Sequence, residues 1–186
     1  MKQLAIEFFS RVNRNSVGTL LGHLNKLPAE DCDLLLLIGS SGGANEWARS
    51  AFSALANLPE SVHLTTCGCG TVDSAAVSIL CAGQRRLCLP HTRFQMHQAT
   101  WKINELVDLR RAQEIADILR SDDASHATVI SAATQCPFEE IHELIRKGVV
   151  WDAQEAKRRG LVHEITADKP HLLAGRLVDR IYNVQD

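Results

Sequence analysis

The chain has 186 residues, of which 45% are hydrophobic and 23% are charged, and its formal net charge is -2 at pH 7. This length and composition are typical of one globular domain, which we expect to cover residues 1–186. The near-neutral charge gives no reason to expect a nucleic-acid or membrane partner, and the sequence shows neither a signal peptide nor a run of about eighteen apolar residues. We therefore expect a cytoplasmic protein.

The cysteines agree with that compartment, because most of them lie inside apolar segments. We expect free buried thiols in a reducing environment. A metal site is the alternative, since two cysteines of one expected strand point to the same side, but no second close Cys/His pair supports it. The six residues are Cys32, Cys67, Cys69, Cys81, Cys88 and Cys136.

Strand and helix patterns alternate in the first half of the chain. Residues 33–39 form a continuous apolar run bounded by charge and glycine, which is typical of a strand buried on both faces. Pro28 and Pro59 each end a helical pattern. In chain order we expect a strand over 4–9, a helix over 13–27, a strand over 33–39, a helix over 47–58, a strand over 62–67 and a helix over 73–83.

Helices dominate the second half. The longest pattern, residues 104–134, contains neither Gly nor Pro. Pro137 suits the first position of a helix, and Asp152 with Glu155 resembles a capping box. The repeated strand–helix units predict an α/β fold with a mainly parallel sheet. We expect strands over 86–90 and 93–98, helices over 104–134, 137–148 and 152–160, a strand over 161–165 and a closing helix over 171–182.

The first unusual junction is the Gly-Ser-Ser-Gly-Gly turn at 39–43, after a buried strand. Adjacent glycines bring backbone N–H groups close to a ligand, and at a helix start these groups stabilise an anion. A plain strand-to-helix turn explains the same residues equally well. Phosphate loops are excluded, because the chain has neither a GxGxxG motif nor a Gly-Lys-Ser/Thr ending.

The second junction, residues 70–76, places Ser74 at the start of a helix with small residues after it. A serine nucleophile needs a constrained position and a backbone N–H near the developing oxyanion. Helix capping by Asp73 and Ser74 is the alternative. The GxSxG elbow is absent, so α/β-hydrolases are not indicated.

A base for that serine is available at His97, which ends the strand-like run before Thr100. A structural role for this histidine is the alternative. The residues by themselves therefore supply a serine, a histidine and a glycine turn, but they do not show that the three meet.

Taken together, these segments resemble the ClpP proteolytic-subunit family of the crotonase-type fold. The turn SSGGA is similar to the family's Ser-Pro-Gly-Gly, GTVDSAAV to its GxxxSxxA segment and MHQ to its His-Gln strand end, and DAQEAKRRGLVHEI is similar to its C-terminal helix and strand. The likeness covers nearly the whole chain. It implies ClpP/crotonase-type repeated β-β-α and βα units, a mainly parallel sheet and a protruding handle helix at about 104–134.

The resemblance also implies a serine endopeptidase site. Ser74 would be the nucleophile, His97 the base, and the N–H groups of Gly43 and Ala75 the oxyanion hole, with Gly42 shaping the turn. No metal or organic cofactor is required. The substrate would be a peptide or an unfolded protein, and the chain would form a homo-oligomeric ring, with an AAA+ ATPase or a paralogous subunit as a possible partner.

Two departures from the family pattern predict low activity. Gly148 occupies the place of the triad's acid, so His97 lacks its usual partner. Asp152 is near in sequence and is a doubtful third member, since a helix cap explains it better. Ser41 replaces the proline of the glycine turn.

Two other functions stay open. A catalytically silent ring subunit, serving as a scaffold, is favoured by the missing acid and opposed by the retention of Ser74 and His97. An acyl-CoA enzyme of the same broad fold would need glutamates near the oxyanion hole, and none lies between Glu60 and Glu105.

Overall fold

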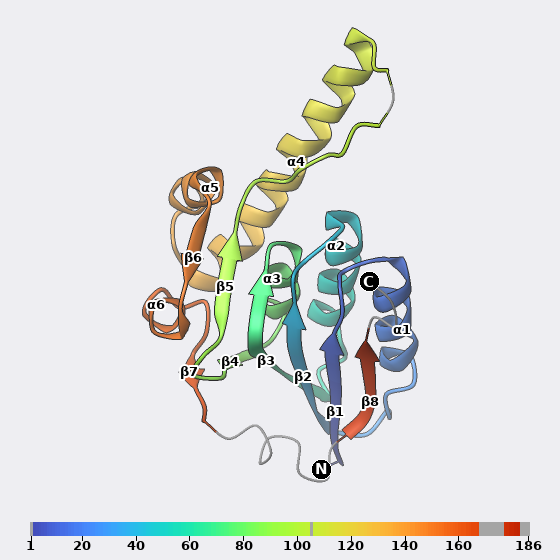
Figure 1. The fold of residues 1–186 in the computed structure, drawn as a ribbon. Coiled ribbons are helices and arrows are strands. Elements are labelled where there is room, and N and C mark those ends of the chain that lie inside the picture. The colour runs from blue at the N-terminus through green and yellow to red at the C-terminus, as the bar shows by residue number, and fades with distance from the viewer. Residues whose placement is uncertain (1, 105, 168–176, 183–186) are drawn as a thin grey trace.

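The computed structural model describes residues 2–104, 106–167 and 177–182 (Figure 1). Its described strands form one eight-stranded sheet in the order β6-β5-β3-β2-β1-β8, with β4 beside β3 and β7 beside β4. Every pairing is parallel except that of β5 with β6. The strands are β1 (Lys2–Phe9), β2 (Cys32–Ser40), β3 (Val62–Asp73), β4 (Arg85–Cys88), β5 (Arg93–Met96), β6 (Val149–Trp151), β7 (Glu164–Ile165) and β8 (Leu177–Tyr182).

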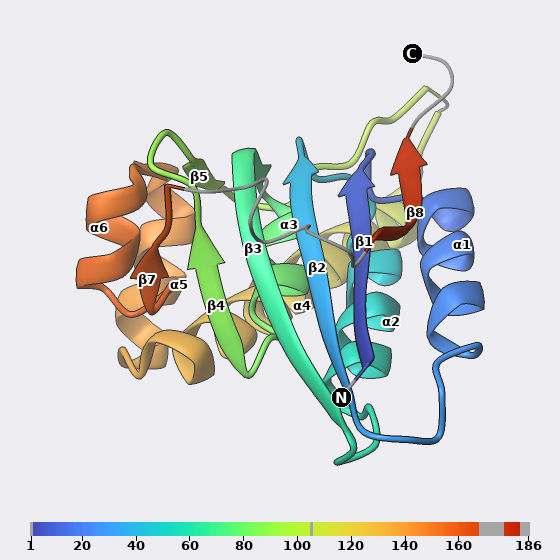
Figure 2. The same cartoon turned by 90° about the horizontal axis from the view of Figure 1, so that it is seen from below.

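The helices connect these strands. Figures 1 and 2 show α1, α2 and α3 on one face of the sheet, while α4 projects beyond the body of the molecule. None of the helices that the structure describes is long and apolar enough to cross a membrane. Their bounds are α1 (Arg14–Leu24), α2 (Asn45–Ala56), α3 (Ala75–Leu80), α4 (Leu109–Thr134), α5 (Phe138–Lys147) and α6 (Ala153–Arg158).

The core is built around β2, whose side chains are buried on both faces of the sheet, as its apolar run predicts. Leu34, Leu36 and Ile38 belong to the main cluster under the helices. Leu35 and Leu37 belong to a second cluster with Ala5, Cys67 and Leu87. Each buried leucine contributes about 1.5–3 kcal/mol relative to an exposed one, so β2 anchors the turn that follows it. The predicted α/β fold with a mainly parallel sheet is confirmed.

The largest differences from the expected helices are at the long helix and at the closing helix. The long helix begins at Leu109 rather than 104, because the Asp108 side chain accepts a hydrogen bond from the Arg111 N–H at 2.8 Å and caps it. The expected closing helix is wrong over 177–182, where β8 pairs with the open edge of β1. Residues 171–176 of that prediction lie outside the described residues.

None of the six cysteines forms a disulfide, and four of them are buried, whereas Cys69 and Cys136 are half-buried. Burial raises the pKa of Cys81 to about 12 and that of Cys88 to about 11, so both stay protonated at neutral pH. Over the described ranges, no group of three or more His, Cys, Asp or Glu side chains is arranged to hold a metal ion.

Candidate active site

Ser74 stands between β3 and α3 in a strained conformation. Its φ is 54° and its ψ is -126°, a region that residues with a side chain rarely adopt, at a cost of about 1–3 kcal/mol. The Ser74 N–H donates to the carbonyl oxygen of Gln95 at 2.6 Å, which helps to hold it there. The serine side chain makes no capping hydrogen bond to α3, so the capping alternative is wrong for Ser74.

Asp73 does not cap the helix by its side chain either. Its carboxylate accepts the Gln95 N–H at 3.0 Å and a guanidinium N–H of Arg93 at 2.8 Å. These contacts accompany the pairing of Thr71–Asp73 with β5, so β3 runs six residues beyond the expected strand end at Cys67. The helix expected from 73 therefore starts at Ala75, after the serine.

The glycine turn lies directly against this serine. Gly42 has a φ of 83°, and a Cβ at this position would be 2.6 Å from the Asp73 carbonyl oxygen and 2.8 Å from the Ser74 Cβ. On its other side the turn is tied to Val12, whose N–H donates to the Gly42 oxygen at 2.8 Å and whose oxygen accepts the Ala44 N–H at 2.9 Å. Only a glycine lets the backbone approach the serine so closely.

His97 directly follows β5 and faces the same cavity as Ser74 and Gly43, a space of about 340 Å³. Its Nδ1 lies 2.7 Å from the carbonyl oxygen of Gln98. A carbonyl oxygen only accepts, so Nδ1 carries the proton and Nε2 presents a free lone pair. The described contacts include no hydrogen bond between Ser74 and His97, and such bonds are often long in enzymes without substrate.

Neither position considered for the acid brings a carboxylate to His97. The β5–β6 register pairs Met96 with Val149, and its continuation sets Gly148 opposite His97. Gly148 has a φ of 70°, and a Cβ there would meet no atom within 4 Å. Asp152 is exposed and caps α6, accepting the Glu155 N–H at 2.8 Å, and no described contact links it to His97.

A buried carboxylate that the sequence did not single out lies on α4. Asp123 is 7% exposed and accepts the Ala99 N–H at 2.7 Å and a side-chain N–H of Gln98 at 3.3 Å. Helical spacing cannot reveal these contacts, because the partners are 24 and 25 residues away in the chain. The available signal was a carboxylate on the buried face of a helix, where charge is costly unless it is hydrogen-bonded.

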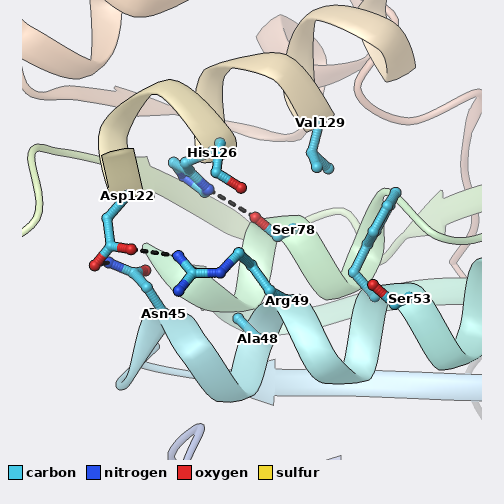
Figure 3. A pocket seen from close by; sticks show the side chains of 10 residues that line it. Asn45, Ala48, Arg49, Ser53, Ser78, Asp122, His126 and Val129 are labelled. Carbon is cyan, nitrogen blue, oxygen red and sulfur yellow. Dashed lines mark hydrogen bonds and ion pairs between the residues drawn. The ribbon is translucent and has the colours of Figure 1, made fainter. Parts of the chain in front are cut away.

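A second cavity of about 230 Å³ lies between α2 and α4 (Figure 3). Asn45 and Asp122 border both this cavity and the one that holds Ser74. An ion pair joins Asp122 to Arg49, and Nδ1 of His126 lies 2.7 Å from the Ser78 hydroxyl. The second cavity therefore contains another serine–histidine pair.

His126 has a strongly shifted titration. Its Nε2 is buried with no hydrogen-bond partner among the described residues. Burial, and next the charge of nearby His97, lower the pKa of His126 to about 4. The folded protein therefore holds this imidazole neutral at pH values where the unfolded chain protonates it.

That shift predicts an acid-sensitive contribution to stability. Between the unfolded value of 6.5 and the folded value of about 4, the unfolded chain binds the extra proton, so stability falls as the pH falls, by up to about 3 kcal/mol. His126→Asn should lose less stability than wild type between pH 7 and pH 4 in urea denaturation at fixed protein concentration. Exposed His63→Asn is the control and should keep the wild-type pH dependence. Equal pH dependence in wild type and His126→Asn would contradict the shift.

Comparisons with known proteins concern the family and the fold of the chain. Residues 1–169 match the model of the family described as Clp protease. The chain is 30% identical over 180 residues to ATP-dependent Clp protease proteolytic subunit 2 of Thermobifida fusca, covering 95% of this chain and 87% of that protein. It is 28% identical over 171 residues to ATP-dependent Clp protease proteolytic subunit 3 of Rhizobium johnstonii, covering 90% of this chain and 86% of that protein. In structure it resembles a mutant of ClpP1 from Listeria monocytogenes, with a TM-score of 0.76 and 23% identity over 90% of this chain and 94% of that chain.

Proposed function

We propose that this chain, which belongs to the Clp protease family of serine peptidases, uses Ser74 as its nucleophile and His97 as its general base. One observation carries the proposal: a serine in a strained conformation faces the same cavity as a histidine whose Nε2 lone pair is free. The strain argues for function, since a serine that only begins a helix has no need of it. We treat residues 1–186 as one catalytic domain.

In this mechanism Nε2 of His97 removes the proton of the Ser74 hydroxyl as the oxygen attacks the peptide carbonyl. The same nitrogen then delivers the proton to the leaving amine, and water releases the acyl group by the reverse steps. The Gln98 carbonyl supports this role, because it fixes the Nδ1–H tautomer that a triad acid ordinarily selects. No metal or organic cofactor takes part in these steps.

The oxyanion would be held by the N–H groups of Gly43 and Ala75. Ala75 opens α3, so its N–H has no acceptor within the helix. The bonds of Val12 to Gly42 and Ala44 skip Gly43, which is the pattern of a residue whose own N–H points the other way. Gly42 keeps both donors close to Ser74. Ser41, in place of the family's proline, leaves this turn less rigid.

The missing carboxylate at Gly148 implies slow turnover. An acid beside the histidine stabilises the imidazolium of the transition state, and its loss with intact geometry costs about four orders of magnitude. Gly148→Asp is a poor remedy, because a φ of 70° is strained for any residue with a side chain. Asp152 is engaged in capping α6, so we leave it out of the catalytic group.

The test is hydrolysis of short activated peptides by the purified protein. We expect a slow rate, with His97→Ala at least about a hundredfold slower, since general-base catalysis contributes about 10²–10⁴. His97→Ala purified in the same way also controls for contaminating peptidases. A wild-type rate no higher than that of His97→Ala would remove the peptidase proposal. It would leave the second candidate, a silent ring subunit, which the absent acid at Gly148 favours.

The projecting segment supports an oligomer. Large apolar side chains on and before α4 are exposed, with Leu109 at 88% and Leu106 at 104%. Large apolar side chains that gather in one exposed segment are usually covered by another subunit. The other exposed apolar side chains of this segment are Trp101, Ile103, Val107 and Ile118. We propose that copies of this chain meet here in a homo-oligomeric ring that accepts peptides or unfolded proteins, with an AAA+ ATPase or a paralogous subunit as further partners. The four buried cysteines of the chain form no disulfide, which fits the reducing environment of the cytoplasm.

Light scattering on a sizing column checks this surface. Wild type is expected at several times the monomer mass of 20.5 kDa. Leu109→Asp should shift the protein toward the monomer, because the new charge would have to be buried in the interface. Thr19→Asp adds the same charge at an exposed position of α1 and should keep the wild-type mass. A wild-type monomer at micromolar concentration would contradict the ring.

A further inference from the structure

One peptide group lies between His97 and a buried carboxylate. Its carbonyl oxygen, that of Gln98, is 2.7 Å from Nδ1 of His97. Its N–H, that of Ala99, donates to Oδ1 of Asp123 at 2.7 Å. Both groups belong to the peptide bond between residues 98 and 99, so two short hydrogen bonds and one peptide connect the imidazole to the carboxylate.

We propose that Asp123 replaces the absent triad acid and acts on His97 through this peptide. The inference rests on the proposed function, and it makes Asp123 a positioning residue. When Nε2 takes the proton of Ser74, the imidazolium keeps its Nδ1 proton. The Nδ1–H group continues to donate a hydrogen bond to the Gln98 oxygen. Asp123 stays ionised, and its charge polarises the peptide in the direction that strengthens the bond to Nδ1.

The surroundings of Asp123 leave its charge unneutralised, so that it can act on His97 through the peptide. The side chain is buried, and in the part of the chain that the structure describes no ion pair includes it. Its neighbour Asp122, one residue earlier on α4, is paired with Arg49 instead. The second carboxylate oxygen of Asp123 accepts from the side chain of Gln98 at 3.3 Å, so both oxygens hold the segment that follows His97.

Position 123 is fixed by the rest of α4. Ala127, Ile130 and Thr134 follow it at helical spacing on the buried face of this helix. The segment after β5 runs alongside α4 (Figure 1), and Trp101 of that segment stacks with Arg111, with a guanidinium-to-ring distance of 5.7 Å. The packing of α4 therefore sets where the Gln98 carbonyl points, and hence how His97 is oriented.

Asp123→Asn is the central variant, because it keeps an oxygen that accepts the Ala99 N–H and removes the charge. It also replaces the oxygen that accepts the 3.3 Å bond from Gln98 by an NH2 group, to which the carbonyl end of the Gln98 amide can turn. We expect kcat to fall about tenfold with KM within twofold, since a charge two hydrogen bonds from the imidazole acts weakly but only in the transition state. If Asp123 merely holds the segment, Asp123→Asn would keep more than half of the wild-type kcat, and the proposal would be overturned. Asp117→Asn removes an exposed carboxylate from the same helix and should match wild type.

Ala99→Pro tests the same connection from the other side. It removes the N–H that Asp123 accepts and leaves the carboxylate in place. We expect the same tenfold loss of kcat, and no further loss when Asp123→Asn is added, because both changes break one connection. If Asp123→Asn does not fold, Ala99→Pro decides alone, and a kcat above half of the wild-type value overturns the proposal.

A readout without catalysis separates this inference from the proposed function. Diethyl pyrocarbonate acylates only neutral imidazole, and peptide mapping reports His97 specifically. The pH midpoint of His97 modification should fall by about one unit in Asp123→Asn. A tenfold weaker affinity of the imidazole for its second proton corresponds to one pH unit. An unchanged midpoint rejects the relay, even if the wild type proves to be a silent scaffold. The other charged groups around His97, which are the same in both proteins, are Arg11, Glu46 and Asp122, and the neutral imidazole of His126 lies near it as well.

Discussion

Replacing Ser74 with alanine is expected to abolish labelling of the protein by a fluorophosphonate probe. Such probes phosphonylate a serine only when a base removes its proton and an oxyanion hole stabilises the product. Ser74 has His97 in the same cavity and the Gly42–Gly43 turn against it. Intact-mass measurement should show one adduct per wild-type chain and none in Ser74→Ala, and peptide mapping should locate the adduct on Ser74.

Ser78→Ala is the matched control, because Ser78 is hydrogen-bonded to a histidine, whereas the described contacts include no such bond for Ser74. Ser78 sits inside α3 in a helical conformation, and the pKa of its partner His126 is lowered to about 4. A base of so low a pKa is poorly matched to removing a hydroxyl proton near neutral pH. Ser78→Ala should therefore keep full labelling. Labelling that survives Ser74→Ala and is lost in Ser78→Ala would move the active site to the second cavity.

Gly42→Ala is expected to lower peptide hydrolysis by about 10²–10³, which is the contribution of one oxyanion donor. The added methyl group would lie 2.6 Å from the Asp73 oxygen and 2.8 Å from the Ser74 Cβ, and a φ of 83° is strained for alanine. Both effects push the turn away from the serine, so the Gly43 N–H leaves its place. The measurement is kcat/KM for a short peptide, with thermal melting recorded beside it.

Gly22→Ala provides the control for a glycine without such constraints. Gly22 lies in α1, and a Cβ there meets no atom within 4 Å. Alanine is favoured over glycine in a helix by about 1 kcal/mol, so this variant should be slightly more stable and equally active. If Gly42→Ala keeps wild-type kcat/KM, the turn does not supply the oxyanion hole.

The glycines and prolines and the apolar patterns of the sequence were sufficient to predict most of the fold. The run at 33–39 predicted a strand buried on both faces, and β2 confirms it. The prediction was wrong where tertiary contacts override local pattern. Residues 177–182 have a helix-like sequence but pair with β1, and residues 68–73 extend β3 because Thr71–Asp73 find a partner in β5. Strand pairing depends on what lies alongside, which no local spacing reports.

For the candidate site, the sequence by itself named the chemistry-bearing side chains, and only the tertiary structure decided their relations. The glycine turn, Ser74 and His97 stand out by residue type and junction, because nucleophile, base and backbone donors need particular residues. Their meeting depends on β3 and β5, whose hydrogen bonds bring position 74 beside Gln95. Asp123 could not be found this way, because its hydrogen-bond partners are 24 and 25 residues earlier in the chain. The pattern of a helix repeats every 3.6 residues and reports which face is buried, but it does not report which segment lies against that face. Local interactions repeat over a few residues and can be predicted from the sequence. The contacts of Asp123 cross the fold and depend on the packing of α4 against α3 and α5.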